Sequence, residues 1–207
     1  MRAGLGLALA ALLAGCAAQP EGAGGPVVAR PGLDAVLARL PDEAAGFTRG
    51  MTADMEATQP GQGRAVDYAT PARAGVAARA AIASVIVYDK GLPPLPPETP
   101  PAVVEAQLSE GVAEALMPAP GRQMAEAGRR ALEVPGGAPL QCAVLDGTYG
   151  RTAMWQQLCV GVAAGRFLKV FIAVPVRQRD LLAMDADGFT RAIAQAARNT
   201  GAVLPTR

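Results

Sequence analysis

The C-terminal third of the chain alternates apolar and polar side chains with a period of two, and this pattern constrains the fold more than any other feature. Apolar residues alternate over 153–162, and over 167–176 they fall on one face while Lys169 falls on the other. Residues typical of turns, 146–150, separate the first of these runs from another apolar segment at 140–145. Three consecutive antiparallel strands are therefore predicted.

Further strands are predicted upstream of this meander. Residues 80–88 include Ile82, Val85, Ile86 and Val87, which are apolar on both faces, so this segment is expected at the centre of a sheet. Shorter strands are expected at 46–50 and 65–69. A proline-rich segment, 91–101, then follows, and it cannot be a regular helix or a central strand because proline lacks an amide donor. We interpret it as a stiff crossover loop; a polyproline recognition element is the alternative.

Helices are predicted from periodicity and from capping residues. Apolar residues at 33–40 indicate a short first helix. Thr99 as the cap and Pro100 at the first helical position open a longer helix, whose apolar stripe we assign to the core. Its members are Val104, Leu108, Val112, Ala115 and Leu116. Residues 123–132 suggest a second helical piece, and Asp185 or Asp187 caps a last helix that stops before Gly201.

The order of these elements defines the expected fold class. It indicates an α+β domain over residues 33–207, in which an antiparallel sheet of about five or six strands packs against two main helices. After the N-terminal segments are set aside, about 175 residues remain, which is enough for one domain with a sizeable core.

The N-terminus carries an export signal. Arg2 supplies a positive charge, Leu5–Leu13 form an apolar run, and small residues precede Cys16, which is the order of a secretory signal peptide over 1–15. The run is shorter than the roughly 20 residues needed to span a bilayer. In Leu13-Ala14-Gly15-Cys16 the chain closely resembles the lipobox of bacterial lipoproteins.

This resemblance implies a lipid anchor. It implies that the Cys16 thiol receives a diacylglycerol, that the leader is cleaved before this residue, and that the new amino terminus is acylated, with palmitate as a typical chain. Ala17 in place of aspartate implies transfer to the outer membrane, with the domain facing the periplasm. Residues 16–32, rich in Gly, Ala and Pro, are expected to form a flexible tether.

Cysteine usage agrees with an oxidising compartment. If Cys16 carries lipid, Cys142 and Cys159 remain as a pair. They lie symmetrically about the predicted turn, so a hairpin centred there places them nearly opposite each other on adjacent strands. A disulfide needs Cα atoms about 5.5 Å apart, which such pairs satisfy. A register change of one residue would instead point them to opposite faces and leave two buried thiols.

Several functional classes find no support in the sequence. The chain has no histidine, which removes the commonest general base and the commonest zinc ligand. Its formal net charge of +1 argues against nucleic acid as a partner. Neither serine, Ser84 nor Ser109, lies in a nucleophile elbow. No catalytic residue, cofactor or metal site is therefore predicted, and we lean against an enzyme.

One polar cluster is a candidate ligand site. Asp146, Tyr149, Arg151 and Trp155 gather around the tip of the predicted hairpin, and loop tips of this kind often carry function. A solvated turn without a ligand is the alternative interpretation.

The domain is also similar to a known fold. It resembles the Mog1/PsbP-like fold in its Pro41…Gly46-Phe47 entry, in the strand Ala83-Ser84-Val85-Ile86-Val87-Tyr88, and in its helix–meander–helix order. That resemblance implies a binding or accessory module without catalytic residues. We therefore expect a lipid-anchored envelope protein that binds a partner protein or supports an assembly. The alternatives are a carrier of a small ligand and a carboxylate-based envelope enzyme such as a glycan hydrolase.

Overall fold

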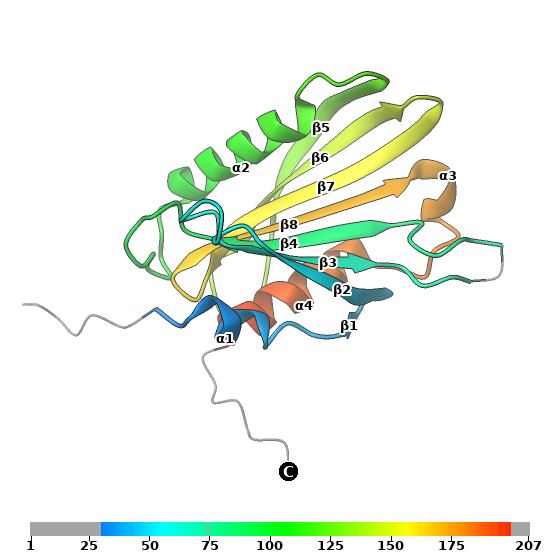
Figure 1. Cartoon of the computed structure of the whole chain (residues 1–207). Helices are drawn as coiled ribbons and strands as arrows, with labels where there is room; N and C mark the ends of the chain where they lie inside the picture. The colour runs from blue at the N-terminus through cyan, green and yellow to red at the C-terminus, as the bar shows by residue number, and fades with distance from the viewer. Residues whose placement is uncertain (1–29, 74, 200–207) are drawn as a thin grey trace, which may run out of the picture.

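The computed structural model describes residues 30–73 and 75–199, and their eight strands form one curled antiparallel sheet (Figure 1). The strands are β1 (Glu43–Ala44), β2 (Phe47–Asp54), β3 (Arg64–Ala69), β4 (Ile82–Tyr88), β5 (Arg122–Leu132), β6 (Leu140–Tyr149), β7 (Thr152–Ala163) and β8 (Arg166–Pro175). Their order across the sheet is β1-β2-β3-β4-β8-β7-β6-β5. The helices are α1 (Leu33–Leu37), α2 (Pro101–Leu116), α3 (Val176–Arg179) and α4 (Ala186–Arg198).

The predicted α+β class, with an antiparallel sheet and two main helices, is confirmed. The expected five or six strands are too few, and the predicted helix over 123–132 is wrong. That segment is β5, which pairs with β6 from Arg122 opposite Tyr149 to Leu132 opposite Leu140. Its Ala, Arg, Glu and Gln residues favour a helix locally, but the hydrogen bonds offered by the edge of β6 decide the outcome.

The predicted meander of β6, β7 and β8 is confirmed, including the register of its hairpin. Cys142 of β6 lies directly opposite Cys159 of β7, and a disulfide joins them. Their Cα atoms are 4.0 Å apart, closer than the expected 5.5 Å. The short distance is typical of antiparallel pairs that do not exchange backbone hydrogen bonds. Both cysteines are fully buried.

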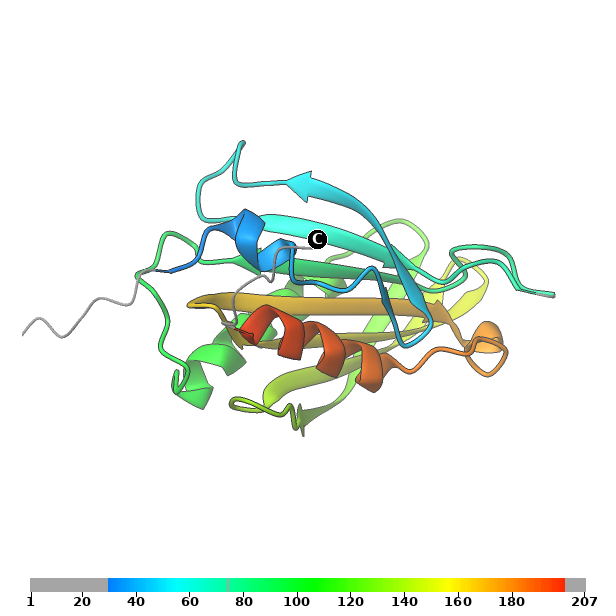
Figure 2. The same cartoon turned by 90° about the horizontal axis from the view of Figure 1, so that it is seen from below.

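Helix α4 packs against one face of the sheet (Figure 2). Phe189 is fully buried, and its ring centroid lies 4.7 Å from that of Phe47 and 5.1 Å from that of Tyr68. Asp185 caps the helix as predicted, since its Oδ1 accepts a hydrogen bond from the Gly188 amide at 2.9 Å. The helix ends at Arg198, and Gly201 lies outside the described residues.

Helix α2 covers the opposite face over β5, β6 and β7, where its predicted stripe is part of the core. Its start differs from the prediction. The helix begins at Pro101, and the Thr99 hydroxyl donates to the Pro96 carbonyl at 2.6 Å instead of capping the helix. The first helical amide needs no partner, so proline at this position costs no hydrogen bond. Residues 91–100 form the predicted loop between β4 and α2.

The chain enters the domain at the turn between β7 and β8. Arg30 Nη1 donates to Asp89 Oδ2 at 2.7 Å, and Arg166 Nη1 donates to the Pro31 carbonyl at 2.6 Å. Arg30 and Pro31, which belong to the predicted tether, are therefore held against the folded domain. The predicted signal peptide, Cys16 and the rest of the tether lie outside the described residues. No helix within 30–73 and 75–199 has both the length and the apolarity that crossing a bilayer requires.

The stability of the domain is expected to fall at alkaline pH because of Tyr68. Burial raises the pKa of Tyr68 from 10 to about 12, and its hydroxyl donates to the Pro41 carbonyl at 2.8 Å. The unfolded chain therefore loses this proton first. The stabilisation from protonated Tyr68 is complete below pH 10 and is lost as the pH rises toward 12. Its size is about 1.4 kcal/mol for each unit by which the Tyr68 pKa in the folded protein exceeds that in the unfolded chain.

Chemical denaturation at a series of pH values between 8 and 12 measures this loss. Burial also raises the pKa of Tyr88, so some of the loss remains when Tyr68 is replaced. In Tyr68→Phe, the free energy of unfolding should fall less steeply between pH 10 and 12 than in the wild type. An equally steep decline in that variant would contradict the prediction.

Candidate functional site

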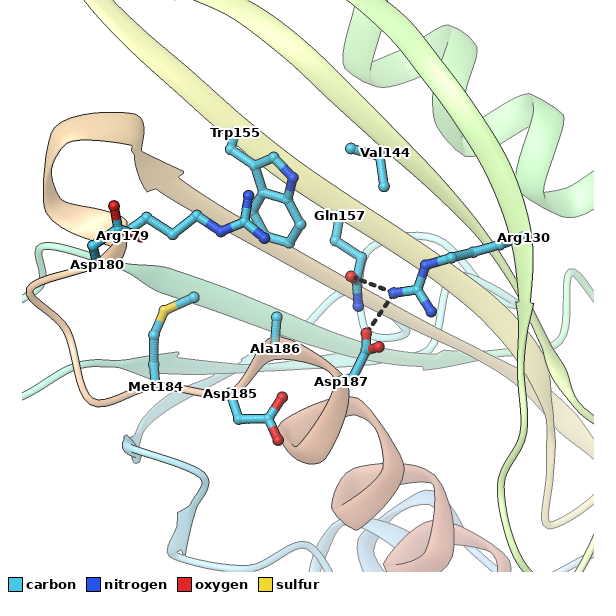
Figure 3. Close-up of a pocket in the computed structure, with 10 residues that line it drawn as sticks. All are labelled: Arg130, Val144, Trp155, Gln157, Arg179, Asp180, Met184, Asp185, Ala186 and Asp187. Carbon is cyan, nitrogen blue, oxygen red and sulfur yellow. Dashed lines mark hydrogen bonds and ion pairs between the residues drawn. The ribbon is translucent and has the colours of Figure 1, made fainter.

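A groove of about 500 Å³ lies between the sheet and the N-terminal end of α4 (Figure 3). Three strands, α3, and the segment that joins α3 to α4 supply its walls. The lining residues are Arg130, Val144, Trp155, Gln157, Arg179, Asp180, Met184, Asp185, Ala186 and Asp187. A volume of this size suits a small ligand or a few side chains of a partner.

Trp155 and Arg179 form one wall of the groove. The Arg179 guanidinium carbon lies 4.2 Å from the centroid of the Trp155 ring, so the two groups make a cation–π contact. Trp155 belongs to β7 and is 8% exposed, whereas Arg179 is exposed at the end of α3. The aromatic ring is thus fixed by the sheet, and a surface arginine covers it.

A hydrogen-bonded network forms the opposite wall. Arg130 Nη2 of β5 donates to Gln157 Oε1 at 3.0 Å and also to Asp187 Oδ1. The Gln157 amide donates in turn to Thr190 Oγ1 at 3.3 Å. Gln157 is only 1% exposed, so this network satisfies a buried amide and joins the β5 edge to α4.

The carboxylates of the groove do not form an obvious catalytic pair. Asp187 is ion-paired with Arg130, and Asp185 accepts the Gly188 amide as the helix cap. A glycosidase needs two carboxylates that face each other across a cleft, one of them free to give a proton. Within the part of the chain that the structure describes, no three His, Cys, Asp or Glu side chains are grouped to hold a metal ion.

The structure separates the four residues of the predicted hairpin-tip cluster. Asp146 and Trp155 are cross-strand partners, but only Trp155 lines the groove. Tyr149 lies at the end of β6, where its hydroxyl accepts from Arg122 Nη1 at 3.2 Å. Arg151 is exposed in the turn. The four residues therefore do not line one pocket.

Trp155 is the only one of the ten lining residues that is also a predicted site residue, and three of the other nine make the main polar contacts of the groove. Arg130 belongs to a segment whose composition predicts a helix, and a helix would not place it beside β7. Arg179 carries no local signal, because it lies in a helix of only four residues. The sequence predicts Asp187 only as a possible helix cap, and its pairing with Arg130 joins residues 57 positions apart.

Comparison with known proteins gave no match to a protein-family model, to a curated protein or to a solved structure. The groove is therefore interpreted from its own geometry.

Proposed function

We propose that this protein is a lipid-anchored module of the cell envelope that binds a partner without catalysis, through the groove at Trp155. The observation that carries this proposal is the groove itself, in which a fixed aromatic ring lies between two arginines and three carboxylates. Aromatic and arginine side chains dominate binding sites because they combine apolar area with directed polar groups.

The position of the groove agrees with a tethered module. Arg166 at the start of β8 contacts Pro31, where the chain enters the domain, whereas Trp155 lies opposite Val174 near the end of β8. Eight residues at about 3.4 Å each put these sites roughly 27 Å apart along the strand. In Figure 1 the chain enters at one end of the sheet and α3 lies at the other. With a lipid on Cys16, the groove would point away from the membrane.

The alternatives receive less support from the groove. A carrier of an apolar ligand would need an apolar lining, but five charged side chains line this groove. A carboxylate-based enzyme would need a free acid, and two of the three carboxylates are engaged in the contacts described above.

Photocrosslinking in the native host would test the proposal. Met184 lines the groove, whereas Met51 is 79% exposed on β2, so the photoreactive residue benzoylphenylalanine can replace a methionine at either site. We expect a discrete crosslinked species from position 184 that is absent from position 51 and is lost in a Cys16→Ser background. Equal crosslinking from both positions, or none from either, would contradict the proposal.

The anchor is tested separately by metabolic labelling. Cells given an alkyne analogue of palmitate should label the wild-type chain, and Cys16→Ser should abolish the label. An unlabelled wild-type chain, or a Cys16→Ser chain that is labelled as strongly as the wild type, would contradict lipidation at this residue.

A further inference from the structure

We infer that the groove binds an organic cation, a guanidinium or ammonium group on a short apolar stem, and that Arg179 occupies the same place on Trp155 when this ligand is absent. The inference rests on the proposed function, because it specifies the chemistry of the ligand. It follows from how Arg179 is held, from the charges around it and from the apolar part of the lining.

Arg179 is held weakly enough to be displaced. It is the last residue of α3, a four-residue helix that has no buried residue. Among residues 30–73 and 75–199, no carboxylate lies within ion-pair distance of its guanidinium, so the contact to Trp155 is its main attachment. An exposed cation–π contact contributes only about 0.5–1 kcal/mol. A second cation can therefore compete for the ring.

The charges of the groove favour a cation as that competitor. With Arg179 displaced, the three carboxylates of Asp180, Asp185 and Asp187 face two guanidinium groups, that of Arg130 in the lining and that of Arg191, which lies 3.9 Å from Asp187 Oδ2. An incoming cation replaces the positive charge of Arg179 beside these carboxylates. An anion would meet an excess of negative charge in a partly enclosed space, where like charges repel more strongly than in water.

The remaining lining suits the stem of such a ligand. Val144, Met184 and Ala186 present apolar surface beside the Trp155 ring (Figure 3). Methionine adapts its shape to different apolar groups, and the methylenes of a basic side chain pack well against such surfaces. The groove thus offers an aromatic face for the charged head and an apolar wall for the chain that carries it.

Fluorescence provides a direct test, because Trp155 is the only tryptophan of the chain. The lipidated full-length protein in detergent would be titrated with agmatine, a dication with a guanidinium and an ammonium at the two ends of a four-carbon stem, and separately with glutarate, a dianion of similar length. We expect a saturable change with agmatine only. Arg179→Ala should tighten agmatine binding roughly two- to five-fold, because the internal competitor is removed.

Matched variants distinguish displacement from a general effect of charge. Arg177 is exposed on the same short helix but does not line the groove, so Arg177→Ala should leave the affinity unchanged within about two-fold. Asp180→Asn should weaken binding. Weaker binding in Arg179→Ala, or equal tightening in Arg177→Ala, would overturn the role assigned to Arg179.

The outcomes also separate this inference from the proposed function. A saturable response to glutarate instead of agmatine would overturn the ligand class and leave the groove as a binding site. No response to either probe, together with no crosslink from position 184, would overturn both. If agmatine binds and suppresses the crosslink from position 184, the cation comes from a basic side chain of the partner. If agmatine binds and the crosslink persists, the ligand is a free cation.

Discussion

Phe189→Ala is expected to lower the free energy of unfolding by about 3–5 kcal/mol, because this side chain anchors α4 to the sheet. Phe189 is fully buried, and its ring contacts both Phe47 and Tyr68. Alanine would leave a cavity and remove two aromatic contacts, each of which contributes about 0.5–1.5 kcal/mol beyond buried area. Urea denaturation followed by circular dichroism measures the loss.

The substitution should also disturb the groove. Phe189 lies two residues after Asp187, so loosening the first turns of α4 displaces the partner of Arg130. Tyr149→Ala is the matched control, because this aromatic residue is 44% exposed and its removal should cost less than about 1 kcal/mol. A comparable loss of stability in the two variants would show that the α4 interface does not dominate the core.

Removing the disulfide is expected to lower the free energy of unfolding by about 3 kcal/mol. Cys142 and Cys159 are 17 positions apart, and closing a loop of about this length restricts the unfolded chain by that amount. The double variant Cys142→Ala with Cys159→Ala tests this without introducing a polar group into the buried site. Chemical denaturation of the variant and of the wild type with its disulfide intact gives the difference.

Burial adds a kinetic expectation for the same bond. Both cysteines are fully buried, so a reductant should reach the disulfide only when the domain opens. Alkylation and mass spectrometry should find no free thiol at either position in the folded protein under mild reduction. Cys16→Ser, which leaves this pair intact, should match the wild-type domain in stability. Free thiols at both positions in protein purified without reductant would contradict the assignment.

The candidate site is only partly predictable from the sequence. Trp155 can be identified because turn residues and an aromatic residue gather near the hairpin tip, and the hairpin is encoded locally. Its neighbours in the groove cannot be identified from the sequence, because Arg130 lies 25 residues before Trp155 and Arg179 lies 24 residues after it. No local spacing relates three such segments. They meet because only β6 separates β5 from β7 in the sheet and because α3 packs against β7.

Local signals in the chain are sufficient for several elements. The period of two predicts β7 and β8, the symmetry of Cys142 and Cys159 about the turn predicts the hairpin register, and Asp185 marks the start of α4. The identity of β5 depends instead on its tertiary environment, because its residues favour a helix until the edge of β6 offers a ladder of hydrogen bonds, which is interrupted only between Glu126 and Gly128. The groove depends on that environment as well, because long-range packing, which no local pattern encodes, sets which side chains meet across the sheet.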